Sequence, residues 1–108
     1  MRELVENLVR TVNAFELEGT LALFAPDAVI DDVSVGDTFV GRDGVRRYVE
    51  RFFIGYNTTS RILSIEEDGV LDAVVRLDFT GDFGHEVGIL RITIKSSGLI
   101  GRIDADLE

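Results

Sequence analysis

Apolar residues recur along the start of the chain at the spacing of a helix. They stand at steps of four and three residues, at Leu4, Leu8, Val12 and Phe15. This pattern predicts an amphipathic helix with one apolar face. We expect the helix to run on to Glu18, with Gly19 making the break. A short second helix is expected at residues 20–24, before Pro26, which lacks the N–H that a continuing helix needs.

A strand, a turn and a third helix are expected next. Residues 28–33 alternate in the manner of a strand, and residues 35–41 are typical of a turn or short hairpin. A third helix is expected at about residues 42–53, with Tyr48 beside its apolar face. That face carries Val45, Val49 and Phe52.

From residue 58 onward the pattern is typical of β structure. Four runs are expected to form strands, at residues 58–67, 70–80, 85–95 and 99–107. Asp68 and Gly69, between the first two runs, predict a two-residue hairpin turn. Helices followed by antiparallel strands predict an α+β fold with the helices on one concave face of the sheet. No linker or repeat interrupts the chain, so residues 1–108 are expected to form a single domain.

Composition and net charge limit the partners, the location and the cofactors that we expect for this protein. A net charge of −9 repels phosphate backbones, and no basic cluster with aromatic residues is present, so we expect no nucleic-acid partner. No apolar stretch approaches the ~18 residues of a membrane span, and the charged N-terminus does not resemble a signal peptide. We therefore expect no membrane contact and a cytoplasmic location. With no cysteine, one histidine (His85) and no phosphate-cradling loop, we expect neither a metal site nor a cofactor.

The run from Leu23 to Arg47, LFAPDAVIDDVSVGDTFVGRDGVRR, resembles the nuclear transport factor 2-like superfamily. Its SnoaL-like and ketosteroid-isomerase-like members share a helical start, an LFA-x-DA turn and a G-R-D-x-V helix opening. The resemblance implies a cone-shaped fold with three N-terminal helices packed on the concave face of a curved antiparallel sheet. It also implies a pocket for a small apolar ligand and a homodimer formed through the sheet. The substrate stays open, because this fold hosts many unrelated activities.

Asp32 is the main candidate for a catalytic residue. Strand side chains alternate, so Asp32 shares a face with Ala28 and Ile30. The resemblance matches it to the carboxylate base of ketosteroid isomerases, which moves a proton alpha to a carbonyl. By the same resemblance, Tyr48 faces the pocket, and we expect a bound ligand to contact Asp32 together with further side chains. These are Leu8, Val12, Ile30 and Tyr48. The alternative is that Asp31 and Asp32 merely end the strand.

The rest of the isomerase machinery is missing. Leu8 and Leu90 stand where the family has its two oxyanion donors, and neither can donate a hydrogen bond to a developing enolate. Two hypotheses therefore remain. The first is an isomerase or cyclase-type enzyme that uses Asp32 as general base on a small apolar carbonyl or cyclic compound. The second is a non-catalytic ligand-binding or dimerisation module.

Arg76 and Asp78 form a third candidate, because they resemble the Arg-x-Asp pair of limonene-type epoxide hydrolases. Residues two apart in a strand point the same way, so the arginine could hold a carboxylate that activates water. The other interpretation rests on the apolar alternate positions of residues 71–79. If these fill the core, Arg76 and Asp78 form ion pairs on the solvated face of the sheet. His85 is either an exposed residue or a proton shuttle at the mouth of the pocket.

Overall fold

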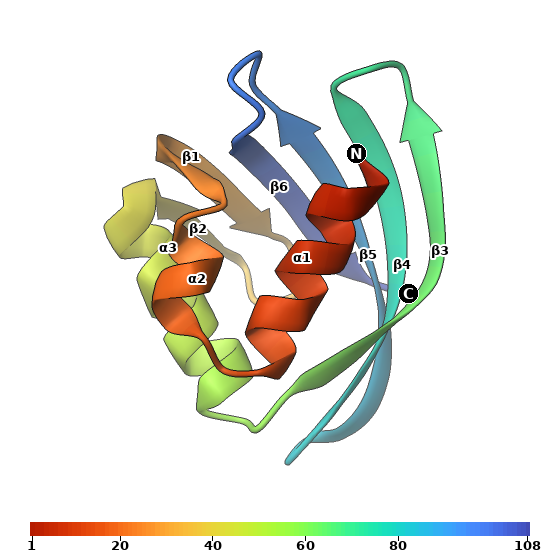
Figure 1. The fold of residues 1–108 in the computed structure, drawn as a ribbon. Coiled ribbons are helices and arrows are strands. Elements are labelled where there is room, and N and C mark those ends of the chain that lie inside the picture. The colour runs from red at the N-terminus through yellow and green to blue at the C-terminus, as the bar shows by residue number, and fades with distance from the viewer.

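In the computed structural model, which describes residues 1–108, three helices lie on the concave face of a curved six-stranded sheet (Figure 1). The third helix continues into a π-helical extension, Glu50–Ile54. The other elements are α1 (Arg2–Asn13), α2 (Leu17–Leu21), β1 (Phe24–Asp32), β2 (Asp37–Val40), α3 (Gly41–Val49), β3 (Thr59–Asp68), β4 (Asp72–Gly81), β5 (Gly84–Ile94) and β6 (Ile100–Leu107). The predicted α+β fold and its helix-on-sheet layering are confirmed.

The strands lie in the order β2-β1-β6-β5-β4-β3. Neighbouring strands run antiparallel, except that β1 and β6 run parallel. The expectation of a wholly antiparallel sheet was therefore wrong. The C-terminal strand thereby joins the short β1–β2 hairpin to the long β3–β4–β5 meander. As a result, the end of β1 lies across the concave face from β4 and β5 (Figure 1).

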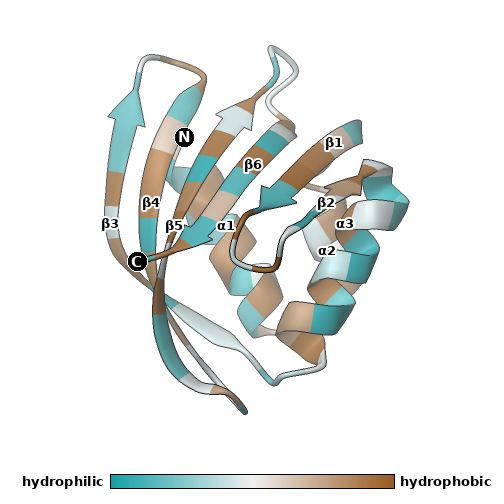
Figure 2. Cartoon of the chain, turned by 180° about the vertical axis from the view of Figure 1, so that it is seen from behind, coloured by the Kyte–Doolittle hydropathy of each residue, from teal (hydrophilic) through white to brown (hydrophobic).

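The core lies between the helices and the concave face of the sheet. On β4 the apolar row faces inward, with Ala73, Val75 and Leu77 all at 3% exposure or less. These residues pack with the buried face of α1, which carries Val5, Leu8 and Val12. The opposite face of the sheet mixes polar and apolar residues (Figure 2). Of the two interpretations of the alternating residues in β4, the structure therefore has the one in which the apolar residues fill the core and the charged residues lie on the outer face of the sheet.

The first two helices differ from the expectation. α1 ends at Asn13 rather than Glu18, and Phe15 takes a left-handed conformation with φ +56°. A hydrogen-bonded turn holds this break, because the Thr20 hydroxyl contacts both Thr11 Oγ1 and the Glu16 carbonyl at 2.9 Å. Gly19 lies inside α2 instead of ending α1. The hydrogen bond from Thr20 to Thr11 thus fixes the turn between α1 and α2. The helical period of the sequence does not reveal such a contact between two elements.

Three boundaries also shift. β1 begins at Phe24 and includes Pro26, so residues 20–24 do not form the expected second helix. The connection between β3 and β4 is a three-residue loop, residues 69–71, and not the two-residue turn that Asp68 and Gly69 predicted. Residues 35–41, expected to form a turn or short hairpin, hold the end of a turn and strand β2, and the hairpin is completed by β1.

Candidate ligand-binding site

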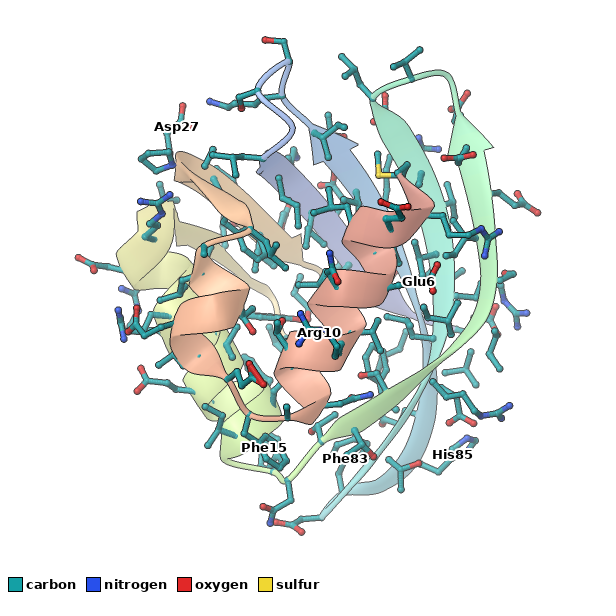
Figure 3. The ribbon with its side chains drawn as sticks, viewed as in Figure 1. Glu6, Arg10, Phe15, Asp27, Phe83 and His85 are labelled. Carbon is teal, nitrogen blue, oxygen red and sulfur yellow. The ribbon has the colours of Figure 1, made fainter.

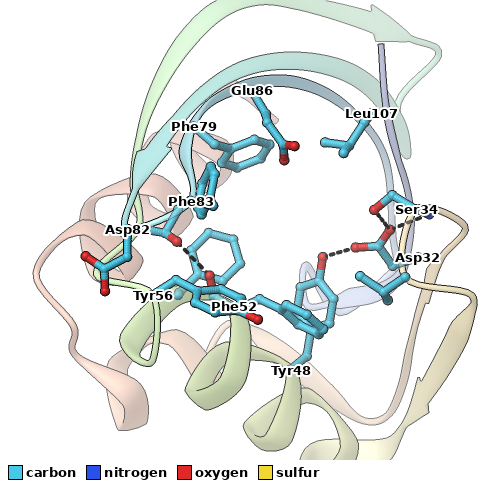
Figure 4. A pocket seen from close by; sticks show the side chains of 13 residues that line it. Asp32, Ser34, Tyr48, Phe52, Tyr56, Phe79, Asp82, Phe83, Glu86 and Leu107 are labelled. Carbon is cyan, nitrogen blue, oxygen red and sulfur yellow. Dashed lines mark hydrogen bonds between the residues drawn. The ribbon is translucent and has the colours of Figure 1, made fainter.

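A cavity of about 490 Å³ opens between the end of α3, the end of β1 and the β4–β5 hairpin (Figure 4). Most of its lining is apolar or aromatic. The 13 lining residues are Asp32, Ser34, Val35, Tyr48, Phe52, Phe53, Tyr56, Thr58, Phe79, Asp82, Phe83, Glu86 and Leu107. Its size falls in the range of roughly 300–1,000 Å³ that is typical of small-molecule pockets.

Asp32 lies in the wall of this cavity at the last position of β1, where only 6% of the residue is exposed. Its Oδ1 accepts hydrogen bonds from the backbone N–H of Ser34 at 2.9 Å and from the Ser34 hydroxyl at 2.5 Å. Its Oδ2 accepts a hydrogen bond of 2.5 Å from the Tyr48 hydroxyl. These donors fix the carboxylate at the cavity wall, as Figure 4 shows. Asp32 is not merely the exposed end of a strand.

Tyr48 of α3 is the partner that couples this carboxylate to the helices. Its ring lies 5.0 Å from the Phe39 ring and 5.1 Å from the Phe52 ring, measured between centroids. Burial, and then the neighbouring negative charge of Asp32, raise the pKa of the Tyr48 phenol well above its ordinary value of 10.0. The phenol therefore stays protonated at neutral pH and donates to Asp32.

Aromatic rings continue from Tyr48 to the mouth of the cavity. The Phe52 and Tyr56 centroids are 6.2 Å apart, and the Tyr56 and Phe83 centroids are 6.1 Å apart. Tyr48, Phe52 and Tyr56 follow one another at steps of four residues, so they share one side of α3 and its extension. The π-helical turn and the segment after it carry this row toward Phe83 on the β4–β5 loop.

The residues expected to contact a ligand divide between two cavities. Leu8, Val12 and Ile30 line a second, apolar cavity of about 50 Å³, which lies deeper in the core. Tyr48 lines both cavities, whereas Asp32 lines only the larger one. The structure therefore brings Tyr48 and Asp32 together and leaves the helix-one side chains beneath them.

Arg76, Asp78 and His85 lie outside both cavities. The Arg76 guanidinium forms two hydrogen bonds to the Glu108 carboxylate, at 2.6 and 2.8 Å. Asp78 forms an ion pair with Arg61 at 3.0 Å, and its Oδ1 contacts His85 Nε2. These side chains belong to the outer face of the sheet, and Figure 3 shows His85 on that side near the β4–β5 loop. The ion-pair interpretation of Arg76 and Asp78 fits this placement, and neither residue lines either of the two cavities in which it could act on a substrate.

Sequence reasoning missed five polar residues of the cavity: Ser34, Tyr56, Thr58, Asp82 and Glu86. The step of four residues from Phe52 could have indicated Tyr56. Glu86 alternates with the outward His85 and so faces inward, but this needs the pairing of Phe79 with Glu86 across β4 and β5. No group of three or more metal-ligating side chains converges anywhere in the chain. None of the helices has the length and apolar character that crossing a membrane requires.

A family model, that of the SnoaL-like domain, matches residues 5–98. The match spans most of the chain, and together with the helix-on-sheet fold and its cavity it defines the class: the protein belongs to the SnoaL-like domain family. This confirms the resemblance stated from the LFA-x-DA and G-R-D-x-V segments. A comparison with curated proteins gives no match.

Solved structures share the fold at low sequence identity. A candidate ketosteroid isomerase from Kribbella flavida superposes with a TM-score of 0.87 at 20% identity, over 99% of this chain and 76% of that one. The epoxide hydrolase/cyclase-like enzyme SalBIII, from pyran ring formation in salinomycin, gives 0.86 at 19% identity over 99% and 89%. A Mycobacterium tuberculosis protein in complex with estradiol-17beta-hemisuccinate gives 0.84 at 20% identity over 94% and 88%.

Proposed function

We propose that this protein binds a small, largely apolar molecule in the larger cavity and acts on it by general acid–base chemistry, with Asp32 as the base. The observation that carries the proposal is a buried carboxylate held by Tyr48 and Ser34 in the wall of an aromatic cavity. Hydrophobic pockets with a few convergent polar groups are the usual sites for small molecules. The similar proteins, which include a steroid complex and a cyclase-like enzyme, fit a role of this class.

The geometry supports a proton transfer at Asp32 Oδ2. A carboxylate oxygen has two acceptor positions, and the Tyr48 hydroxyl occupies one of those on Oδ2. The other can accept a proton from a carbon next to a carbonyl group. Tyr56 lines the same cavity, and its hydroxyl forms no hydrogen bond within the protein, so it is a donor available to a developing enolate oxygen. Tyr56 would then take the role for which Leu8 and Leu90 are unsuitable.

The second candidate function is binding without turnover. It is favoured by Leu8 and Leu90, which line the small apolar cavity and offer no oxyanion donor there. It is also favoured by the hydroxyls of Ser34 and Tyr48, because both already donate to Asp32. A ligand-binding module of this kind would keep the cavity and lose the chemistry.

Exchange of the α protons of β-tetralone in deuterium oxide tests the two functions. We choose this cyclic aryl ketone because it is small compared with the larger cavity of about 490 Å³ and has α protons that a positioned base can remove. We expect the protein to accelerate exchange over buffer, and Asp32→Asn to remove about 10²–10⁴-fold of that acceleration. Asp31→Asn is the matched control, because Asp31 precedes Asp32 on β1 but faces the outer side, where it contacts Arg102. We expect it to retain exchange.

Urea unfolding of the variants shows whether a loss of exchange comes from the missing base or from a less stable protein. Asp32→Asn removes a buried charge that no cation compensates, so urea unfolding should show equal or greater stability than in the original protein. Acceleration that survives Asp32→Asn would refute Asp32 as the base. If β-tetralone binds with no acceleration of exchange, the binding function replaces the enzymatic one.

A further inference from the structure

The lining of the larger cavity carries acidic side chains and no basic one. Asp32, Asp82 and Glu86 are among its 13 residues, whereas no arginine, lysine or histidine is. Ligands with a carboxylate or phosphate group would meet repulsion on entering. The whole chain, with its net charge of −9, extends this negative field to the solvent around the opening.

None of these three carboxylates has a positive partner in the protein. None of the ion pairs includes Asp32, whose three hydrogen-bond donors are all neutral groups. A buried charge is usually balanced by an opposite one. Glu86 likewise forms no ion pair, and in Figure 4 its carboxylate points into the opening. Asp82 also forms no ion pair, and its carboxylate accepts hydrogen bonds only from the neutral amide of Asn57, at 3.1 and 3.3 Å.

The remaining walls suit a cation that is large and weakly hydrated. Six of the chain's nine aromatic residues line this cavity, and the faces of aromatic rings attract ammonium and guanidinium groups. One wall ring already has such a contact: the Arg51 guanidinium, which does not line the cavity, lies 5.1 Å from the Phe52 centroid. Small metal ions are a poorer fit, because no three ligating side chains converge and Asp32 and Asp82 lie on opposite sides in Figure 4.

We propose that the natural ligand of this cavity is an organic cation, a protonated or quaternary amine carried on a small apolar body. The inference rests on the proposed function in so far as the larger cavity is the binding site. Asp32 supplies the opposite charge inside the cavity, Glu86 supplies it at the mouth, and the aromatic rings surround the ammonium group. The apolar body contacts Phe53, Phe79 and Leu107.

A pair of isosteric probes tests the charge alone. Benzyltrimethylammonium and neopentylbenzene have the same shape, and differ in a quaternary nitrogen that replaces a quaternary carbon. Phenylacetate supplies the anionic comparison. Titration monitored by NMR of the intact protein should show the ammonium probe binding at least ~10-fold more tightly than the neutral probe, equivalent to about 1.4 kcal/mol. Phenylacetate should bind most weakly.

Glu86→Gln identifies which carboxylate acts. We expect it to weaken binding of the ammonium probe by ~3–10-fold and to leave neopentylbenzene within about twofold, since a single charge–charge contact at a partly exposed site is modest. Glu66→Gln is the matched control. It makes the same change in net charge on an exposed residue of β3 that neither lines a cavity nor forms an ion pair. We expect no effect on either probe.

Each result decides the proposal. Equal or tighter binding of neopentylbenzene overturns the cationic ligand and leaves the proposed binding function standing. Equal losses in Glu66→Gln and Glu86→Gln also overturn it, because the net charge would then act and not the cavity. If none of the three probes binds, both the cationic ligand and the larger cavity as a binding site are refuted.

Discussion

At the scale of single residues, the contact between Asp32 and Tyr48 defines the site. The two side chains come from β1 and α3, 16 positions apart, and meet in a hydrogen bond of 2.5 Å. A buried carboxylate and a buried phenol each need a polar partner, and each supplies the other's. Apart from Ser34, which donates to Asp32, the rings and side chains packed around the pair are mostly apolar or aromatic, so this group is the main polar feature of the inner cavity wall.

The pKa of Tyr48 is directly testable. Burial and the charge of Asp32 raise it above 10.0 in the folded protein, so the folded state keeps the phenol proton over a range in which the unfolded state loses it. The contribution of Tyr48 to the free energy of unfolding is therefore fully present below about pH 10 and is lost as pH rises through the folded pKa.

The Tyr56→Phe variant leaves Tyr48 as the only tyrosine, so the ultraviolet absorbance of phenolate reports on it alone. In the folded variant, we expect this absorbance to increase only at pH values well above 10. The same variant unfolded in urea is the control and should titrate near the ordinary value. Ionisation near pH 10 without unfolding would contradict the buried contact between Tyr48 and Asp32.

At the scale of elements, close packing sets how the helices meet the sheet. A Cβ on Gly44 of α3 would lie 2.8 Å from the carbonyl carbon of Phe39 on β2, so the helix approaches this strand backbone to backbone. That approach keeps Phe39 buried beside Tyr48 and so helps to place the tyrosine. Gly19 of α2 is different, because the nearest atom to its Cβ position is 3.5 Å away, an ordinary contact.

Alanine substitutions at these two helical glycines should have opposite effects. Gly44→Ala forces α3 away from β2, and we expect a loss of about 1–3 kcal/mol in the free energy of unfolding. Gly19→Ala gains helix propensity without a clash, so we expect a gain of up to ~1 kcal/mol. Urea unfolding of both variants measures the difference. A stabilised Gly44→Ala protein would show that the approach of α3 to β2 is looser than described.

At the scale of the whole molecule, the outer face of the sheet is the surface that the fold leaves without a covering layer. Ion pairs occupy part of it, including those of Arg76 with Glu108 and of Arg102 with Asp104. Apolar side chains lie between them, at Val87 opposite Asp78 and at Ile89 opposite Arg76. Both are half-buried within the single chain. A second copy of the chain would complete their burial.

We therefore predict a symmetric dimer formed through this face. Sedimentation at micromolar concentration should give about twice the mass of one chain. Ile89→Asp places an uncompensated charge in the contact and should weaken dimerisation by ~10-fold or more. Val70→Asp is the control, because Val70 lies in the β3–β4 loop with 86% exposure. A monomer in the original protein would rule out the dimer and leave the outer face solvated.

The sequence by itself determined the α+β class, the order of helices before the long strands, and which residues of a strand share a face. The period of α1 and the alternation of β4 each followed from local burial, and both are seen in the structure. The inward direction of Asp32 followed from its alternation with Ala28 and Ile30, which are almost fully buried. Such properties depend on a few neighbouring residues, so a single sequence is enough to predict them.

Only the tertiary structure decided which side chains share a cavity. Sequence periodicity gives a side chain its face but not its distance to a residue on another element. Leu8 and Val12 were therefore grouped with Asp32, although they line the smaller cavity. The left-handed Phe15 and the parallel pairing of β1 with β6 were missed for the same reason. Contacts between distant segments fix these features, and they form only when the chain has folded.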